Sequence, residues 1–176
     1  LTCKSDECLR SMVLLLCGLL LFSASAGAAD KALDASRIDR GSVLLTEYFA
    51  VLEDPSGSLT LTDVQAPGIA NRFKDVVAPA EAVSYGFTRS AYWLRLPLRN
   101  ASDQPVQRML EIGYAVLSDI QFHQPMGDGT YRSVTTGVAT PFSTRLYPDR
   151  FFVFPLTLPA LSLAQASLAM LRSTAT

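Results

Sequence analysis

The chain has little of the chemistry on which most enzymes and metal sites depend. Its three cysteines, Cys3, Cys8 and Cys17, precede residue 20, so the remainder offers no disulfide framework, cysteine zinc cluster or thiol nucleophile. The single histidine, His123, has no Asp or Glu at ligand spacing and alternates onto a strand face that we expect to meet solvent. We therefore expect neither a metal nor a cofactor.

Motifs for hydrolysis and for phosphate binding are also missing. The sequence has no Gly-x-Ser-x-Gly turn for a serine nucleophile and no phosphate-binding glycine loop. Its 15 basic residues are balanced by 16 acidic ones, so there is no basic excess to attract nucleic acid. These absences favour a binding protein over an enzyme, and 176 residues suffice for one domain with a hydrophobic core.

The N-terminal segment has the layout of a secretory signal peptide. Residues 12–22 are uncharged and mostly apolar, Lys4 and Arg10 precede them, and small residues fill positions 23–29. The apolar run is too short for a bilayer of roughly 30 Å, which needs about 20 residues, although an uncleaved anchor is an alternative. We predict a cleaved signal peptide over residues 1–29, export of the chain, and a flexible leader over residues 30–42.

The most regular pattern in the chain is the stretch from Ala91 to Asn100. It alternates with period two, which predicts a half-buried β-strand. One face carries Tyr92, Leu94, Leu96 and Leu98, and the other carries Trp93, Arg95, Pro97 and Arg99. We expect the second face to be exposed, and the proline predicts a sheet edge or a bulge.

Short apolar or alternating segments separated by turn signals continue along the rest of the chain. A helical turn is expected at residues 62–65, where Thr62 and Gln65 form a capping-box pattern, and residues 69–77 have helical spacing. Residues 137–149 predict a long loop. The expected strands are 43–52, 58–61, 108–113, 117–124, 131–134, 151–158 and 167–172. This pattern predicts an all-β fold, an antiparallel β-sandwich over residues 43–176.

Aromatic and cationic side chains suggest a binding surface. Flat aromatic rings stack on sugars, and guanidinium groups form paired hydrogen bonds with sugars or carboxylates. The residues of these types are Trp93, Arg95, Arg99, Tyr114, Arg145 and Arg150. The alternative is that Trp93 is half-buried under the 137–149 loop and that the arginines form ordinary surface ion pairs.

Two carboxylates support a weaker, catalytic hypothesis. Glu111 and Asp119 lie on successive predicted strands and could act as a pair in glycoside hydrolysis. Paired carboxylates on a sheet face are more often plain surface residues, so we do not read an enzyme from them.

Three runs of the sequence resemble a known family. They are GFTRSAYWLRLPLRN (86–100), LEIGYAVLSDIQFHQP (110–125) and TGVATPFSTRLYPDRFFVFPLTLP (136–159). These runs resemble the type 2 extracellular domain of bacterial seven-transmembrane receptors with diverse intracellular signalling modules. The resemblance implies a periplasmic sensor domain with a jelly-roll sandwich similar to carbohydrate-binding modules. The positions that match the motifs of the family are Trp93, Arg95, Asn100, Glu111, Tyr114, Asp119, Arg145 and Arg150.

The resemblance also sets expectations about the function and the end of the chain. Membrane helices and an output domain follow this domain in such receptors, whereas the sequence here stops at Thr176. We expect a ligand-sensing input domain whose ligand is a small molecule such as a carbohydrate or carboxylate. We also expect it to be truncated before the membrane helices, to lack its last strand and so to have an unpaired sheet edge. The alternative is a stand-alone secreted carbohydrate-binding or adhesion module.

Overall fold

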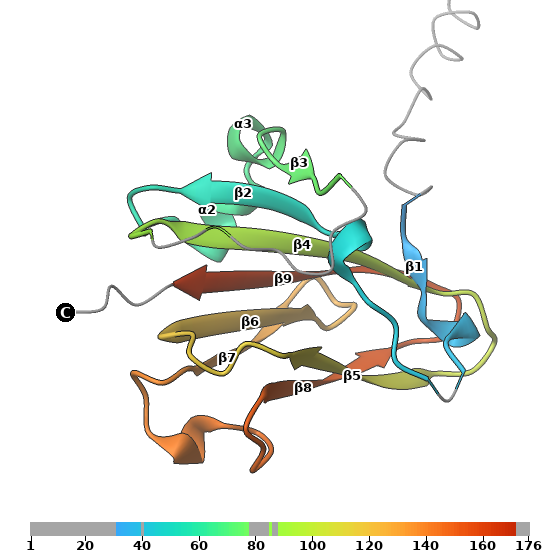
Figure 1. Ribbon diagram of the computed structural model, residues 1–176. Coiled ribbons are helices and arrows are strands. Elements are labelled where there is room, and N and C mark those ends of the chain that lie inside the picture. Colours follow the sequence, from blue (N-terminus) through green and yellow to red (C-terminus); the bar gives the residue numbers. More distant parts are fainter. Residues whose placement is uncertain (1–30, 40, 78–84, 86–87, 172–176) are drawn as a thin grey trace, which may run out of the picture. The chain divides into compact units, whose positions relative to one another are not determined.

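The computed structural model describes residues 31–39, 41–77, 85 and 88–171, and their strands form two sheets (Figure 1). The larger sheet has the order β3-β2-β4-β9-β6-β7, with β1 paired to β4, and the smaller sheet pairs β5 with β8. The strands of the larger sheet are β1 Leu33–Asp34, β2 Ala50–Asp54, β3 Lys74–Asp75, β4 Ala91–Asn100, β6 Asp119–Pro125, β7 Tyr131–Thr136 and β9 Ser162–Leu171. Those of the smaller sheet are β5 Val106–Ile112 and β8 Phe152–Leu158.

The main core lies between the two sheets. Alternate residues of β4 point into it, and they meet aromatic side chains from β6 and β8. Phe122 and Phe154 are both buried, and the centroids of their rings lie 4.7 Å apart. The inward residues of β4 are Tyr92, Leu94, Leu96 and Leu98. The prediction of an all-β sandwich is confirmed, because two sheets pack around this core. The face of β4 that the period of two predicted to be buried is the one that points inward.

β4 is an interior strand, so the prediction of a sheet edge at Pro97 was wrong. β9 pairs with the whole length of β4, while on the other side β2 pairs as far as Arg95 and β1 begins at Leu98. Pro97 therefore lies between the ends of β2 and β1, where neither strand needs a donor from it.

The segment expected to be a flexible leader is part of the sandwich in its described residues. Leu33 and Asp34 form β1, which pairs in parallel with Leu98 and Arg99 of β4. Ala35 is buried and begins the 3₁₀ helix η1, Ala35–Arg37, which Asp34 caps. The sequence did not predict this pairing, because the segment is mostly polar. Its few apolar side chains, Leu33 and Ala35 among them, pack into the main core beside β4.

The region 43–61 differs from its prediction. The chain forms a 3₁₀ helix η2 at Thr46–Tyr48 before β2 begins, and the predicted strand 58–61 is absent. The Asp54 carboxylate accepts hydrogen bonds from the backbone N–H groups of Ser56 and Leu59, which turns the chain back over the sheet. Burial raises the pKa of Asp54, but the hydrogen bonds from Ser56 and Leu59 outweigh it, and the net pKa is lowered.

Two short helices follow this turn. Helix α2, Leu61–Gln65, is followed by α3, Pro67–Ala70. The capping box consists of Thr60 and Asp63 rather than Thr62 and Gln65. Thr60 has an extended backbone, so its hydroxyl can accept from the N–H of Asp63 while the Asp63 carboxylate accepts from the N–H of Thr60.

The strands expected after residue 100 are confirmed with shifted ends. The last predicted strand is longer than expected, since β9 occupies Ser162–Leu171 between β4 and β6. The described part of the chain contains no helix that is long and apolar enough to cross a membrane. The predicted signal peptide, residues 1–29, lies outside the described residues.

Asn100 ties the end of β4 to the end of β8. Its side chain is 1% exposed, and Nδ2 donates to the carbonyls of Gln104 and Pro159 at 2.7 and 2.9 Å. Its Oδ1 accepts from the backbone N–H of Ser102 at 3.0 Å. Because these contacts bury the amide, the pattern Asn100-Ala-Ser102 is not an accessible glycosylation site in the folded domain.

We predict that Asn100→Ala lowers the free energy of unfolding by about 2–3 kcal/mol, because it leaves buried carbonyls unpaired. Urea unfolding followed by circular dichroism measures this loss. Gln104→Ala is the matched control, because that substitution keeps the backbone carbonyl that Asn100 uses and should change stability little. Equal stabilities of the two variants would contradict the role of the amide.

Candidate functional site

Trp93, the centre of the predicted binding face, is buried. Its side chain is 2% exposed and packs with buried Leu52 and Val64 in a second core on the outer face of the larger sheet. Residues 59–73, here called the helical cover, contribute Leu59, Leu61, Ile69 and Phe73 to this core. The expectation of a solvent-facing tryptophan was wrong, and the segment that covers Trp93 is not the 137–149 loop.

Arg95 fastens the helical cover to the sheet. Its guanidinium group donates to the carbonyls of Val64, in α2, and of Ala70, in α3. The Cζ atom lies 3.6 Å from the centroid of the Phe73 ring, a stacked cation–π contact. These contacts occupy the planar fork that was predicted to bind a ligand, so Arg95 has a structural role.

Arg99, although 45% exposed, forms an ion pair within the domain. Its Nε lies 3.4 Å from Oδ2 of the buried Asp34, in β1. The hydroxyl of Ser36, at 2.6 Å, is the main cause of the lowered pKa of Asp34, with backbone N–H groups and Arg99 adding to it. Trp93, Arg95 and Arg99 therefore do not form a common binding hollow.

His123 lies on the same outer face but is not exposed as predicted. The side chain is 7% exposed and its ring stacks on Trp93, with ring centroids 5.7 Å apart. Nδ1 lies 2.7 Å from the Ser133 hydroxyl, and burial lowers the pKa of the imidazole below 6.5. Period two gave the correct face of β6, but it gave no sign that Trp93 and Ser133 pack against the imidazole.

The other five predicted residues lie near one end of the sandwich. Ile112, the last residue of β5, pairs with Phe152, the first of β8, so the loops beside these ends adjoin. The β5–β6 loop leads directly to β6, and the loop after β7 returns to β8 at the same end (Figure 1). The residues that the structure brings to this end are Glu111, Tyr114, Asp119, Arg145 and Arg150.

Backbone hydrogen bonds join the two loops. The N–H of Val138 donates to the carbonyl of Leu117 at 2.9 Å, and that of Ala139 donates to Ser118 at 3.0 Å. The hydroxyls of Thr136 and Thr140 each lie 3.0 Å from that of Thr144. These bonds tie the 137–151 loop to the β5–β6 loop and to itself.

Arg145 contributes to this internal order rather than pointing to solvent. Its Nη1 donates to the backbone carbonyls of Asp149 and Arg150, the latter at 2.9 Å. Its Cζ lies 4.3 Å from the centroid of the buried Phe152 ring. Arg150 is exposed, with Cζ 4.3 Å from the centroid of the Phe151 ring.

Several large apolar side chains are exposed on the same loops. Phe142 is 58% exposed and Leu146 is 43% exposed, on a loop that its own hydrogen bonds hold in place. We call this region the loop-end surface, and its exposed members are Glu111, Tyr114, Val116, Val138, Phe142, Leu146, Tyr147 and Arg150. The apolar members were not predicted as part of a binding surface. A long loop with aromatic residues and two prolines could have indicated one, because binding residues often lie on such loops.

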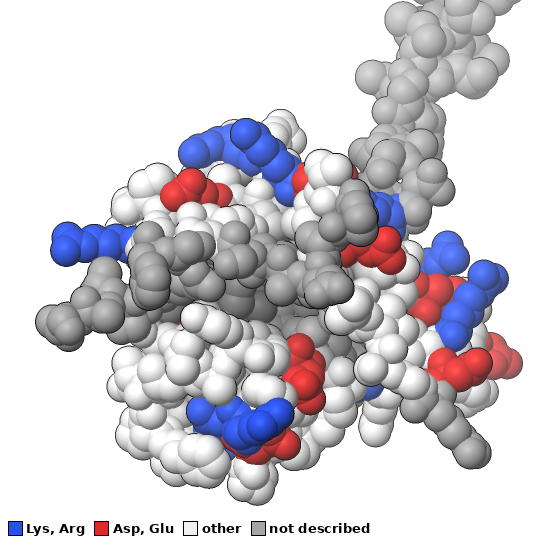
Figure 2. All heavy atoms as spheres, in the orientation of Figure 1, with Lys and Arg blue, Asp and Glu red and all other residues white. Residues whose placement is uncertain are grey.

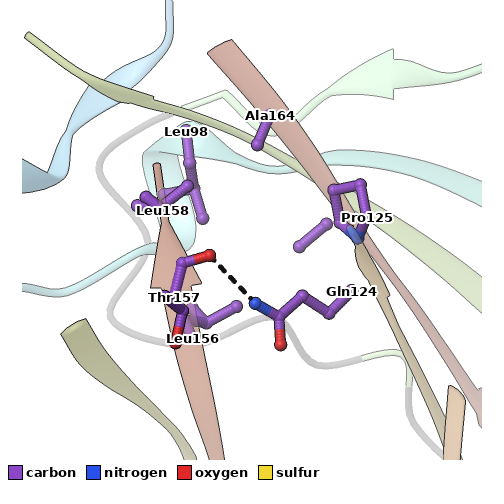
Figure 3. Close-up of a pocket in the computed structure, with 8 residues that line it drawn as sticks. Leu98, Gln124, Pro125, Leu156, Thr157, Leu158 and Ala164 are labelled. Carbon is purple, nitrogen blue, oxygen red and sulfur yellow. Dashed lines mark hydrogen bonds between the residues drawn. The ribbon is translucent and has the colours of Figure 1, made fainter. Parts of the chain in front are cut away.

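One small opening lies among the described residues of the two sheets. This opening, near Gln124 and Thr157, has room for about one water molecule, and the Gln124 amide donates to the Thr157 carbonyl across it (Figure 3). In the described part of the chain, no three His, Cys, Asp or Glu side chains gather as metal ligands would. On the face shown in Figure 2, acidic and basic side chains form small separate groups without a continuous basic patch.

Comparison with known proteins agrees with the resemblance in the three sequence runs. A family model described as 7TMR-DISM extracellular 2 matches residues 46–175. The match covers the strands from β2 to β9 and both loops of the loop-end surface. No curated protein matches the chain.

Proposed function

We propose, since the chain belongs to the 7TMR-DISM extracellular 2 family, that it is the periplasmic ligand-sensing input domain of a bacterial membrane signalling receptor. The family is one of extracellular receptor domains, and the observation that carries the proposal is its match over residues 46–175. We assign the domain no catalytic step, because its role as an input domain requires only that a ligand binds.

We propose the loop-end surface as the place where the ligand binds. Exposed apolar and aromatic side chains on a loop that its own hydrogen bonds hold in place can bind a partner at a lower cost in loop ordering. Arg150 adds an exposed guanidinium group, and Glu111 an exposed carboxylate. Aromatic, cationic and acidic groups together suit a small carbohydrate or carboxylate, which stacks on the rings and forms hydrogen bonds with the charged groups.

Binding experiments test this surface directly. Neutral oligosaccharides, uronic acids and small dicarboxylates would be screened by calorimetry against the full chain. For any compound that binds, Arg150→Gln and Phe142→Ser should each weaken the affinity by about tenfold, equivalent to about 1.4 kcal/mol. Arg132→Gln, at an exposed position towards the far end of β7, should leave it unchanged.

The outcomes separate the ligand surface from the receptor role. Equal affinities for all three variants would place the ligand elsewhere on the domain. Seven hydrophobic segments encoded in frame after residue 176 would support the receptor role. A following coding sequence without such segments would instead favour a secreted carbohydrate-binding module.

A further inference from the structure

His123 has an incomplete set of partners for a buried polar group. Its Nδ1 is satisfied by the Ser133 hydroxyl, whereas its Nε2 is buried without a hydrogen-bond partner. The ring stacks on Trp93 with an angle of 11° between the planes. A proton added to this ring would bring a charge into a site that is largely closed to water, since the side chain is 7% exposed and Nε2 is buried.

The surrounding charges do not compensate for an added proton. β9, which lies between β4 and β6, has no titratable residue. The titratable groups that share the outer face with His123 are Asp54 of β2, Arg95 and Arg99 of β4, Asp119 of β6 and Tyr131 of β7. The helical cover brings Asp63 and Arg72, both exposed. Within the described residues, no carboxylate forms an ion pair with His123.

One stack connects His123 to the helical cover. The imidazole packs on Trp93, and Trp93 packs in turn on Val64 and its apolar neighbours in the cover. The cover is anchored at both ends, by the bond from the Leu59 N–H to Asp54 and by the pairing of β3 with β2. Between these anchors its two short helices are held by Arg95 and by apolar packing on Trp93. The cover and the imidazole thus seal the Trp93 ring together.

We propose that His123 is an acid-sensitive latch, so that uptake of a proton by its imidazole releases residues 59–73 from Trp93. With the cover seated the imidazole is neutral, and with the cover released water can solvate Nε2. Acid therefore favours the released state by linkage. Since the ordinary pKa of histidine is 6.5 and burial lowers it, the cover is fully seated above 6.5 and loses stability as the pH falls below that value. The inference does not depend on which ligand the loop-end surface binds.

The sequence makes the test specific, because the chain has one histidine and one tryptophan. Acrylamide quenching of Trp93 fluorescence in the full chain would be measured between about pH 8 and 5, with circular dichroism to confirm that the sheets persist. We expect the quenching constant to rise reversibly by about twofold or more as the cover is released. His123→Gln should abolish this rise.

A second variant tests the coupling without altering the histidine. Phe73→Leu weakens the seating of the cover, so the midpoint should move upward by about half a pH unit, at about 1.4 kcal/mol per unit. Phe142→Leu, on the loop-end surface, is the matched control and should not move the midpoint.

A flat wild-type profile, a rise that persists in His123→Gln, or an unmoved midpoint in Phe73→Leu would each overturn the proposal. If His123→Gln does not fold, the pH titration of the imidazole NMR resonances is measured in wild type and in Phe73→Leu. In both proteins the midpoint of this titration must agree with the midpoint of the quenching curve, and a disagreement would overturn the proposal.

Discussion

Replacing Trp93 with alanine lowers the free energy of unfolding by about 3–5 kcal/mol, the usual cost of removing a fully buried large aromatic side chain. The side chain is 2% exposed and joins Leu52 of the sheet to Val64 of the helical cover. Small domains have only about 5–15 kcal/mol of stability, so the variant is close to unfolding. Urea unfolding followed by circular dichroism measures the loss, since the variant contains no tryptophan to report by fluorescence.

The control for this experiment is an exposed aromatic residue. Tyr147 is 36% exposed on the loop-end surface, and Tyr147→Ala should change the unfolding free energy by about 0.5 kcal/mol or less. Trp93→Phe keeps a ring in the second core and should fall between the alanine variant and wild type. A Trp93→Ala protein as stable as Tyr147→Ala would show that the tryptophan faces solvent, as the sequence alone suggested.

Gly137→Ala is expected to cost about 3 kcal/mol or more, because a side chain at this position has no room and an unfavourable backbone conformation. Gly137 has φ +151°, and a Cβ atom there would lie 2.0 Å from the carbonyl oxygen of Ser118. The backbone hydrogen bonds from Val138 to Leu117 and from Ala139 to Ser118 hold the two loops together, so neither can move away easily. Urea unfolding followed by Trp93 fluorescence measures the effect.

Gly127 separates the steric part of this effect from the conformational part. Gly127 has φ +84° but nothing within 4 Å of the position of a Cβ atom. Gly127→Ala should therefore cost only about 1 kcal/mol, the penalty of a left-handed backbone. Equal losses for both variants would mean that the contact with Ser118 relaxes without cost. A larger loss at Gly137, together with weaker ligand binding, would tie the order of the 137–151 loop to the loop-end surface.

The strand positions could be predicted because they depend on local alternation. The apolar side chains at positions 92, 94, 96 and 98 identified the inward face of β4 correctly. Period two does not reveal whether the opposite face meets water or another segment, and this is where the predictions for Trp93 and His123 failed. Both side chains are covered through contacts with residues far away in the sequence, such as Val64 for Trp93.

The candidate site was predicted only in part. Glu111, Tyr114, Asp119, Arg145 and Arg150 lie near one end of the sandwich, whereas the other three predicted residues stabilise the outer face of the larger sheet. Arginine suits both roles, because its guanidinium group binds a backbone carbonyl as readily as it binds a ligand. Arg95 illustrates this, since its predicted ligand contacts are replaced by the carbonyls of Val64 and Ala70.

The amino-acid sequence by itself determined the all-β class, the inward face of β4 and the family, because alternation and motif spacing are properties of neighbouring residues. Tertiary structure alone decided that the helical cover seals Trp93, that β1 pairs with β4 after Pro97, and that the two loops meet at one end. Burial depends on which distant segments pack on a face, and no local pattern in the chain records that choice.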